Sequence, residues 1–154
     1  MKRDFLWVEK YRPHKIDECI LPDGSKKSFQ GFLTQGEIPN LLLSGPAGVG
    51  KTTVARALCD EIGASYLLIN GSDEGRSIDT IRNKVKQFAT SVSLTSSAAH
   101  KVVILDEADN MTYDVQMILR AAIEEYHINC RFIFTCNFIN KLIDPIKSRC
   151  TVVD

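Results

Sequence analysis

The residues with the clearest chemical purpose form one glycine-rich segment, Gly45-Pro46-Ala47-Gly48-Val49-Gly50-Lys51-Thr52. The segment fits the pattern G-x-x-x-x-G-K-[ST] at every fixed position. Its glycines allow the backbone to curl so that N–H groups converge on phosphate oxygens, and the positive end of the following helix adds to that field. Lys51 is expected to reach the β- and γ-phosphates of ATP, and the Thr52 hydroxyl is expected to bind Mg²⁺. The segment therefore predicts a nucleotide-binding site.

A second group of candidate residues follows an apolar run. Residues 102–105 (Val-Val-Ile-Leu) predict a buried central strand, and Asp106 and Glu107 come directly after it. Asp106 is expected to hold Mg²⁺, and Glu107 is expected to polarise the attacking water. Residues 106–109 also spell the D-E-A-D box of RNA helicases, but such helicases need two tandem domains and a different glycine-rich loop. Together with the glycine-rich segment, the two carboxylates predict ATP hydrolysis.

Short apolar runs and amphipathic stretches alternate around these residues. The apolar runs predict strands at residues 41–43, 66–69, 102–105, 132–134 and 151–153. Helices are predicted from Lys51 to Ile62 before a stop at Gly63, after a cap at Ser77, and after a cap at Thr112. The stretch from Thr90 to Ala99 is rich in Ser, Thr and Ala and predicts a loop. Strands that are apolar on both faces and alternate with helices predict a mostly parallel sheet with helices on each side.

The composition sets limits on the class of protein. The chain has 154 residues, 19 Lys+Arg, 19 Asp+Glu and 44% hydrophobic residues, which are ordinary values for one globular domain. The zero net charge argues against a generally basic protein that coats nucleic acid, although a local basic stripe remains open. The sequence holds no apolar run long enough for a membrane span and no signal-peptide core, so we expect a cytoplasmic protein (in the host's cytoplasm if it is viral). Its five cysteines lack C-x-x-C spacing and predict reduced thiols used as small apolar residues.

Four further segments resemble one protein family. Residues 7–13 read W-V-E-K-Y-R-P, residues 70–73 read N-G-S-D, residues 135–137 read T-C-N and residues 146–150 read I-K-S-R-C. In this order, along essentially the whole chain, they resemble the motifs of clamp-loader ATPase subunits of the AAA+ class, such as replication factor C small subunits. The segments at 11–13, 16–22 and 70–73 look most similar to the large subunit of the clamp loaders of T4-like phages.

The resemblance implies an α/β P-loop fold with a five-stranded parallel sheet of strand order 5-1-4-3-2. It also implies a pentameric assembly with other clamp-loader subunits, which uses ATP to open a sliding clamp and place it on primer–template DNA. In this family a helical lid and a collar domain follow the ATPase core. Because the chain ends three residues into its last predicted strand, we expect residues 1–154 to be a truncated core without lid or collar.

The resemblance also assigns roles to individual residues. Val8, Tyr11 and Ile20 would surround the adenine, Asn137 would be the sensor that positions water near the γ-phosphate, and Arg149 would be an arginine finger that acts in trans. The full nucleotide set would be Val8, Tyr11, Ile20, Gly45, Gly48, Val49, Gly50, Lys51, Thr52 and Thr53. The helix that begins near Ile78 would face DNA through Arg82 and Lys86, and Arg76 just before the helix would contribute to the same contact.

Less specific interpretations of these residues remain open. An asparagine at a strand end often satisfies only loop backbone, and an arginine after Pro145 is commonly a solvated charge; residues 144–148 are expected to be a loop. The aromatic rings of Trp7 and Tyr11 are more often core residues, and Arg82 and Lys86 could form an ordinary solvated helix face. For the whole protein the alternatives are a non-hydrolysing ATP-binding scaffold subunit, which Glu107 and Lys51-Thr52 argue against, and another AAA+ DNA-replication ATPase. The latter class includes initiators and branch-migration motors, and the segments at 7–13 and 148–150 argue against it.

Overall fold

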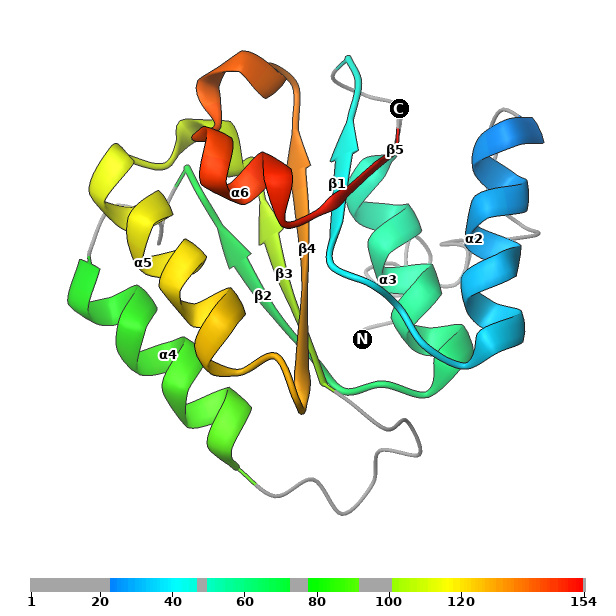
Figure 1. The fold of residues 1–154 in the computed structure, drawn as a ribbon, viewed down its shortest axis with the longest axis horizontal. Coiled ribbons are helices and arrows are strands. Elements are labelled where there is room, and N and C mark those ends of the chain that lie inside the picture. Colours follow the sequence, from blue (N-terminus) through cyan, green and yellow to red (C-terminus); the bar gives the residue numbers. More distant parts are fainter. Residues whose placement is uncertain (1–22, 47–49, 73–77, 92–100, 154) are drawn as a thin grey trace, which may run out of the picture.

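The computed structural model describes residues 23–46, 50–72, 78–91 and 101–153, and these residues form a parallel sheet between two layers of helices (Figure 1). The strands are β1 (Leu41–Ser44), β2 (Tyr66–Asn70), β3 (Lys101–Asp106), β4 (Cys130–Cys136) and β5 (Thr151–Val153). Every pairing is parallel, and the order across the sheet is β2-β3-β4-β1-β5. This is the predicted order 5-1-4-3-2 read from the other edge, so the predicted fold is confirmed.

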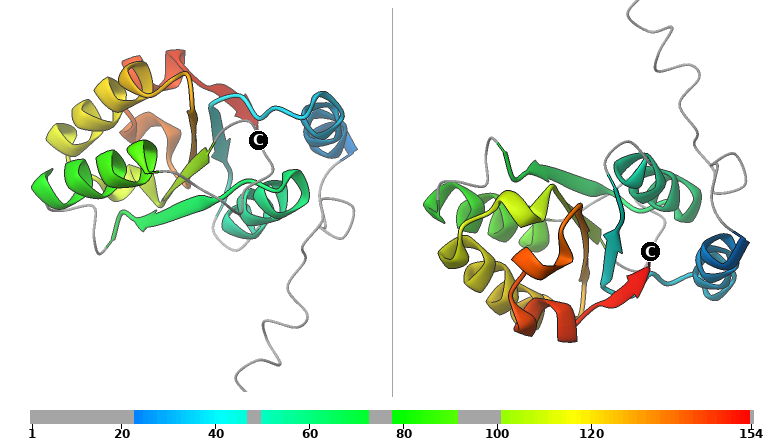
Figure 2. Two further views of the ribbon diagram at one scale, coloured as in Figure 1. Left: turned by 90° about the horizontal axis from the view of Figure 1, so that it is seen from below. Right: turned by 90° about the horizontal axis from the view of Figure 1, so that it is seen from above.

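The helices lie on both faces of the sheet (Figure 2). They are α2 (Asp23–Gln35), α3 (Lys51–Ile62), α4 (Ile78–Thr90), α5 (Tyr113–Glu125) and α6 (Asp144–Ser148), with the short 3₁₀ turns η3 (Ala108–Asn110) and η4 (Ile139–Lys141). One face carries α2 and α3, and the other carries α4, α5 and α6. Within the described part of the chain, no helix is both long enough and apolar enough to cross a membrane.

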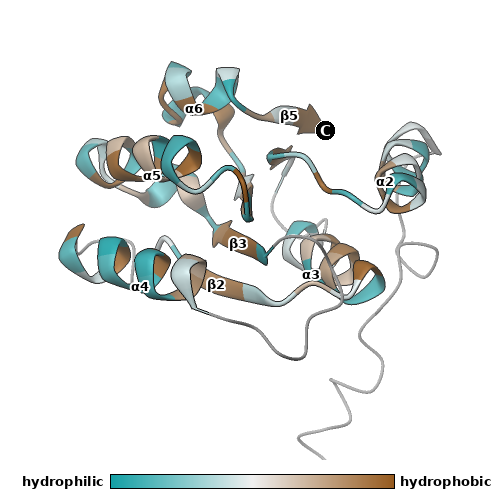
Figure 3. Cartoon of the chain, turned by 60° about the horizontal axis from the view of Figure 1, so that its bottom comes forward, coloured by the Kyte–Doolittle hydropathy of each residue, from teal (hydrophilic) through white to brown (hydrophobic). Residues whose placement is uncertain are grey.

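The strands are apolar on both faces because each face has its own hydrophobic core. Along β3, Val102 and Ile104 belong to the core under α3, whereas Val103 and Leu105 belong to the core under α4 and α5. All four side chains are fully buried. Figure 3 shows hydrophobic strands between helices whose outer faces are hydrophilic. A continuous apolar run is what a strand covered on both sides requires.

Local signals explain where several helices begin and end. The N–H of Val115 donates to the Thr112 hydroxyl at 3.3 Å at the start of α5, which confirms the predicted cap. Gly63 ends α3 at φ 77°, a left-handed conformation that glycine adopts without the Cβ penalty. The predicted cap at Ser77 lies outside the described residues.

One expectation differs from the structure, and one helix was not expected. Residues 144–148 are not a loop, because they form helix α6, with Pro145 in its first turn, where the missing N–H of proline costs no helical hydrogen bond. Helix α2 had no predicted counterpart. Its contact with the core depends chiefly on Phe29, which is 2% exposed.

The buried Gln116 links α5 to the segment between β4 and α6. Its Nε2 donates to Met111 O at 3.1 Å and to Lys141 O at 3.2 Å, and its Oε1 accepts from Ile143 N at 2.8 Å. The residue is only 2% exposed, and all three contacts satisfy backbone groups outside the regular hydrogen bonding of helices and strands. Gln116 therefore fixes the position of α6 relative to α5.

The four described cysteines are buried or partly buried, as the prediction of small apolar side chains requires. Cys59, Cys130, Cys136 and Cys150 are free thiols, and the first three are buried. Burial raises the pKa of Cys59 and of Cys150 to about 12, so both remain protonated at neutral pH. Cys19 lies outside the described residues.

Candidate nucleotide-binding site

The sheet order brings the predicted phosphate-binding residues to one edge. Strands β3, β4 and β1 are neighbours, and their carboxyl ends point in the same direction in Figure 1. The glycine-rich segment follows β1, Asp106 ends β3, and Asn137 follows β4. Residues from three distant parts of the sequence therefore converge at the edge where ligands bind in open α/β sheets.

Lys51 lies at the centre of this convergence. It begins α3 directly after Gly50, whose φ of 79° is left-handed. The Lys51 ammonium donates to Gly45 O at 2.8 Å, to Pro46 O at 2.9 Å and to Asn137 Oδ1 at 2.9 Å. An ammonium group has three donors, so all are engaged with the loop after β1 and with the end of β4. This contact brings two predicted site residues, Lys51 and Asn137, into direct hydrogen-bond distance.

Asp106 accepts two hydroxyl donors on one oxygen. Thr52 Oγ1 and Thr135 Oγ1 both donate to Asp106 Oδ1, the latter at 2.7 Å. Thr135 is 1% exposed and accepts from the N–H of Glu107 at 3.0 Å, so its own hydrogen is directed to Asp106. Hydroxyl and carboxylate oxygens are ligands that Mg²⁺ prefers. Thr52 and Asp106 therefore bring two oxygens of the kind that Mg²⁺ prefers into contact, and Thr135 orients the carboxylate.

Glu107 adopts an unusual backbone conformation. Its φ of 52° makes it the non-glycine residue with positive φ among those that the structure describes. Ser72 Oγ donates to Glu107 Oε2 at 2.5 Å, and Asn110 Nδ2 donates to Ser72 Oγ at 3.1 Å. Backbone strain of this kind persists where the surroundings over-determine it, and it gathers at functional sites. The strain and the serine together orient the carboxylate of Glu107.

Asp109 holds the backbone next to the sensor candidate. Its carboxylate oxygen Oδ2 accepts from the N–H of Asn137 at 3.2 Å and from the N–H of Phe138 at 3.0 Å, and the residue is 9% exposed. The sequence did not identify Thr135, Ser72 or Asp109 as site residues. Ser72 and Thr135 lie in segments that the family resemblance singled out, but their partners are distant in sequence.

Gly71 allows β2 to approach β3 closely beside the site. A Cβ at this position would lie 2.3 Å from Glu107 O and 3.2 Å from Asp106 O, and the N–H of Gly71 donates to Asp106 O at 2.7 Å. Both obstacles are backbone atoms, which cannot rotate away as a flexible side chain could. Glycine is therefore required here by the close approach of two backbones.

Gly71→Ala is expected to lower the free energy of unfolding by about 1–3 kcal/mol, the usual cost of inserting a methyl group into a packed site. Chemical denaturation of the purified chain measures this change. Gly31→Ala is the matched control, because a Cβ at Gly31 meets nothing within 4 Å and the position lies inside α2, where alanine is favoured. Equal unfolding free energies for wild type and Gly71→Ala would contradict the close approach.

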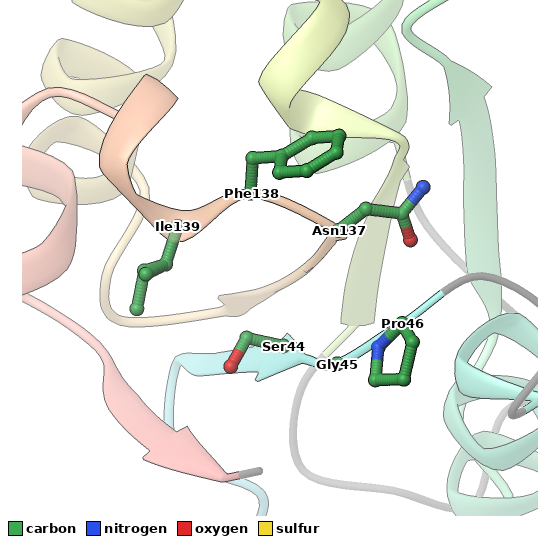
Figure 4. A pocket seen from close by; sticks show the side chains of 6 residues that line it. All are labelled: Ser44, Gly45, Pro46, Asn137, Phe138 and Ile139. Carbon is green, nitrogen blue, oxygen red and sulfur yellow. The ribbon is translucent and has the colours of Figure 1, made fainter.

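A cleft opens between the loop after β1 and the segment after β4 (Figure 4). It has a volume of about 470 Å³ and is lined by Ser44, Gly45, Pro46, Asn137, Phe138 and Ile139. Figure 4 shows Asn137 on one side of this opening and Gly45 and Pro46 on the other. The cleft therefore adjoins the acceptors of Lys51.

Most of the predicted nucleotide-site residues that the structure describes lie together. Lys51, Thr52, Asp106, Glu107 and Asn137 come together, with Gly45, Gly50 and Thr53 on the adjoining loop and first turn of α3. Six predicted residues lie outside the described residues, namely Val8, Tyr11, Ile20, Gly48, Val49 and Arg76.

Arg149 is not part of this cluster. Its guanidinium contacts Glu124 in the last turn of α5. That turn lies beside the beginning of β4, because Cys130 N donates to Tyr126 O at 3.0 Å. The beginning of β4 is at the edge of the sheet opposite Asn137. The side chain of Arg149 is therefore directed away from the phosphate-binding residues of its own chain.

Arg82 and Lys86 form a separate exposed pair on α4. They lie opposite the buried stripe of Ile81, Val85 and Ala89. Arg82 Nη1 lies 3.6 Å from Asp79 Oδ1, an ordinary pair within one helix. The two basic residues therefore face solvent, and a DNA contact stays a prediction.

Comparison with known proteins agrees with this geometry. The family described as "ATPase family associated with various cellular activities (AAA)" matches residues 41–153. The replication factor C small subunit of Archaeoglobus fulgidus is 42% identical over 152 residues, which are 96% of this chain and 47% of that protein. The protein of the same name from Sulfolobus acidocaldarius is 46% identical over 154 residues, which are 97% of this chain and 47% of that protein. The chain thus spans about half the length of these archaeal relatives.

A solved structure shows the same fold. The Thermotoga maritima RuvB Holliday junction branch migration motor superimposes with a TM-score of 0.72 and 24% identity, over 92% of this chain and 47% of that one. At this identity the likeness concerns the fold alone. The relatives named above are archaeal, so the particular similarity to phage clamp loaders stays a prediction. The match to residues 41–153, which include the whole sheet and the site at its edge, shows that the chain belongs to the AAA family of ATPases.

Proposed function

We propose that residues 1–154 are the ATPase core of a clamp-loader subunit that hydrolyses ATP with Mg²⁺ to open a sliding clamp and load it on primer–template DNA. The observation that supports this most strongly is the convergence of Lys51, Thr52, Asp106 and Asn137 in a chain 40–46% identical to replication factor C small subunits. The relatives are about twice as long, which supports further lid and collar domains in the whole protein.

The residues present fit ATP and Mg²⁺. Lys51 would exchange its neutral acceptors for β- and γ-phosphate oxygens, which are stronger partners for an ammonium because they are charged. Thr52 and Asp106, already in contact, would hold Mg²⁺. When bound, the ion neutralises charge that develops on the transferring phosphoryl group. The adenine contacts by Val8, Tyr11 and Ile20, and the phosphate contacts by Gly48 and Val49, are part of the proposal through the family resemblance.

Glu107 and Asn137 would orient the attacking water. Ser72 engages Oε2 of Glu107, so the other carboxylate oxygen is the one expected to accept a proton from water. Asn137 has its backbone held by Asp109 and its side chain on Lys51, so a γ-phosphate that displaces this contact would leave the Asn137 amide beside the water. The carboxylate at 107 also favours a hydrolysing subunit over a non-hydrolysing scaffold.

Arg149 would complete the site of a neighbouring subunit. Its contact with Glu124 supports a role in trans, because the guanidinium is directed away from its own phosphate-binding residues. In the pentamer, α4 would follow the DNA backbone through Arg82 and Lys86, with Arg76 just before it in the sequence. Phosphate contacts of this kind give salt-dependent binding without base specificity.

Lys51→Ala is expected to abolish ATP binding, because the charge that faces the β- and γ-phosphates is lost from a preformed site. Calorimetric titration of the complete subunit with ATP and Mg²⁺ measures the affinity. Lys147→Ala is the control, since Lys147 forms an ion pair with Asp144 on its own helix, at 3.0 Å, away from the phosphate-binding residues. An unchanged affinity for ATP in Lys51→Ala would reject the phosphate-binding role.

A further inference from the structure

The contact between Arg149 and Glu124 differs from the other ion pairs described on this surface. Arg149 Nε and Nη2 both donate to Glu124 Oε1, at 2.9 and 2.5 Å, and Nη1 donates to Pro145 O at 2.9 Å. Two helices, α5 and α6, therefore hold one guanidinium. Lys147 pairs instead with Asp144 of its own short helix, and the Asp144 side chain is 94% exposed.

The contact leaves part of the guanidinium available. An arginine has five N–H groups, and three are used by the contacts above, so one remains on each terminal nitrogen. The side chain of Arg149 is 30% exposed. The unused N–H groups of a planar, oriented guanidinium suit a phosphate group, whose charged oxygens are strong acceptors.

The helices that carry Glu124 and Arg149 are held together by buried contacts. Gln116 on α5 accepts from Ile143 N directly before α6, and Ile146 of α6 is fully buried. The backbones of Glu124 and Arg149 therefore keep a constant relation to each other. The Arg149 side chain could adopt several rotamers on this backbone. Its hydrogen bonds to the Glu124 carboxylate favour one of them.

We propose that Glu124 is a positioning residue for Arg149, which it holds in the orientation presented to the phosphates in the neighbouring subunit's site. The proposal rests on the role of Arg149 in trans that is proposed above. Stability alone does not account for the pair, because exposed ion pairs contribute little and the Glu124 side chain is 54% exposed. The hydrogen bond from Arg149 also lowers the pKa of Glu124 below its ordinary value.

The test compares variants in the assembled complex. Glu124→Ala is expected to lower kcat for ATP hydrolysis about tenfold, because an arginine that samples several rotamers is less often in the productive one. KM for ATP should not change, since the arginine stabilises charge that develops only in the transition state. Glu124→Gln keeps an oxygen that can accept from Arg149 and should restore most of the loss. Glu125→Ala removes the adjacent exposed carboxylate and should have no effect.

Two further measurements separate positioning from a structural role. The melting temperatures of the Glu124 variants should equal that of the wild type. The double variant Glu124→Ala/Arg149→Ala should be no slower than Arg149→Ala alone, because Glu124 acts only through the arginine.

Several results would overturn the inference. If Arg149→Ala lowers kcat but Glu124→Ala leaves it unchanged, Glu124 has no positioning role, while the proposed function stands. A rise in kcat with Glu124→Ala would mean that Glu124 restrains the arginine instead. An equal fall with Glu125→Ala would indicate a general effect on the helix. If Arg149→Ala itself has no effect, the role of Arg149 in trans fails, and the inference fails with it.

Discussion

Replacing Glu107 by glutamine is expected to remove nearly all ATP turnover while ATP binding persists. The amide keeps the shape of the side chain but cannot accept a proton from water, and a general base contributes roughly 10²–10⁴ in rate. The hydrogen bonds from Lys51 to the loop after β1 and from Thr52 to Asp106 do not involve Glu107, so the binding residues should keep their positions. The loss should therefore appear in kcat, not in the dissociation constant for ATP.

The measurement is steady-state hydrolysis by the complete protein, together with calorimetric titration. Glu37→Gln is the control, because Glu37 is an exposed carboxylate in the connection between α2 and β1. Turnover by Glu107→Gln within a factor of about two of the wild type would show that Glu107 is not the base. In that case the strained backbone and the contact with Ser72 would need another explanation.

Arg149→Ala is expected to reduce hydrolysis in the assembled complex by roughly 10³ or more, the range reported for arginines that stabilise transition-state charge in phosphoryl transfer. Each subunit should still bind ATP at its own site, because the guanidinium contacts α5 and α6 away from that site. For the same reason the chain of 154 residues by itself should hydrolyse ATP very slowly, since it has no neighbour to supply the arginine.

A mixing experiment separates action in trans from action in cis. Arg149→Ala subunits and Glu107→Gln subunits are each expected to be nearly inactive alone. Mixed assemblies contain interfaces where an intact Glu107 site meets an intact Arg149 from its neighbour, and these should recover activity. Native mass measurement must show that mixed assemblies form. If they form and no mixture exceeds the separate variants, the proposed role in trans is wrong.

The sequence by itself determined the parts of this protein that depend on local pattern. The glycine-rich segment predicted the turn into α3, and the observed helix from Lys51 to Ile62 has the predicted bounds. The continuous apolar runs predicted all five strands, because a strand buried on both faces has no polar side. The strand order came from the family resemblance, since periodicity does not state which strands are neighbours. The expected roles of Asp106 in Mg²⁺ binding and of Glu107 in water activation followed from their position directly after an apolar run.

Only the tertiary structure decided which polar side chains meet. Helix α6 is too short to show a period, and α2 has too few buried apolar residues to stand out in the sequence. Thr135 meets Asp106 across 29 positions, Ser72 meets Glu107 across 35, and Arg149 meets Glu124 across 25. Each of these pairs exists because parallel strands and the helices between them return the chain to the same region of the fold. A serine, a threonine or a glutamate in such a pair has no local pattern that marks it, since its role depends on a partner that only the packing of the sheet brings near.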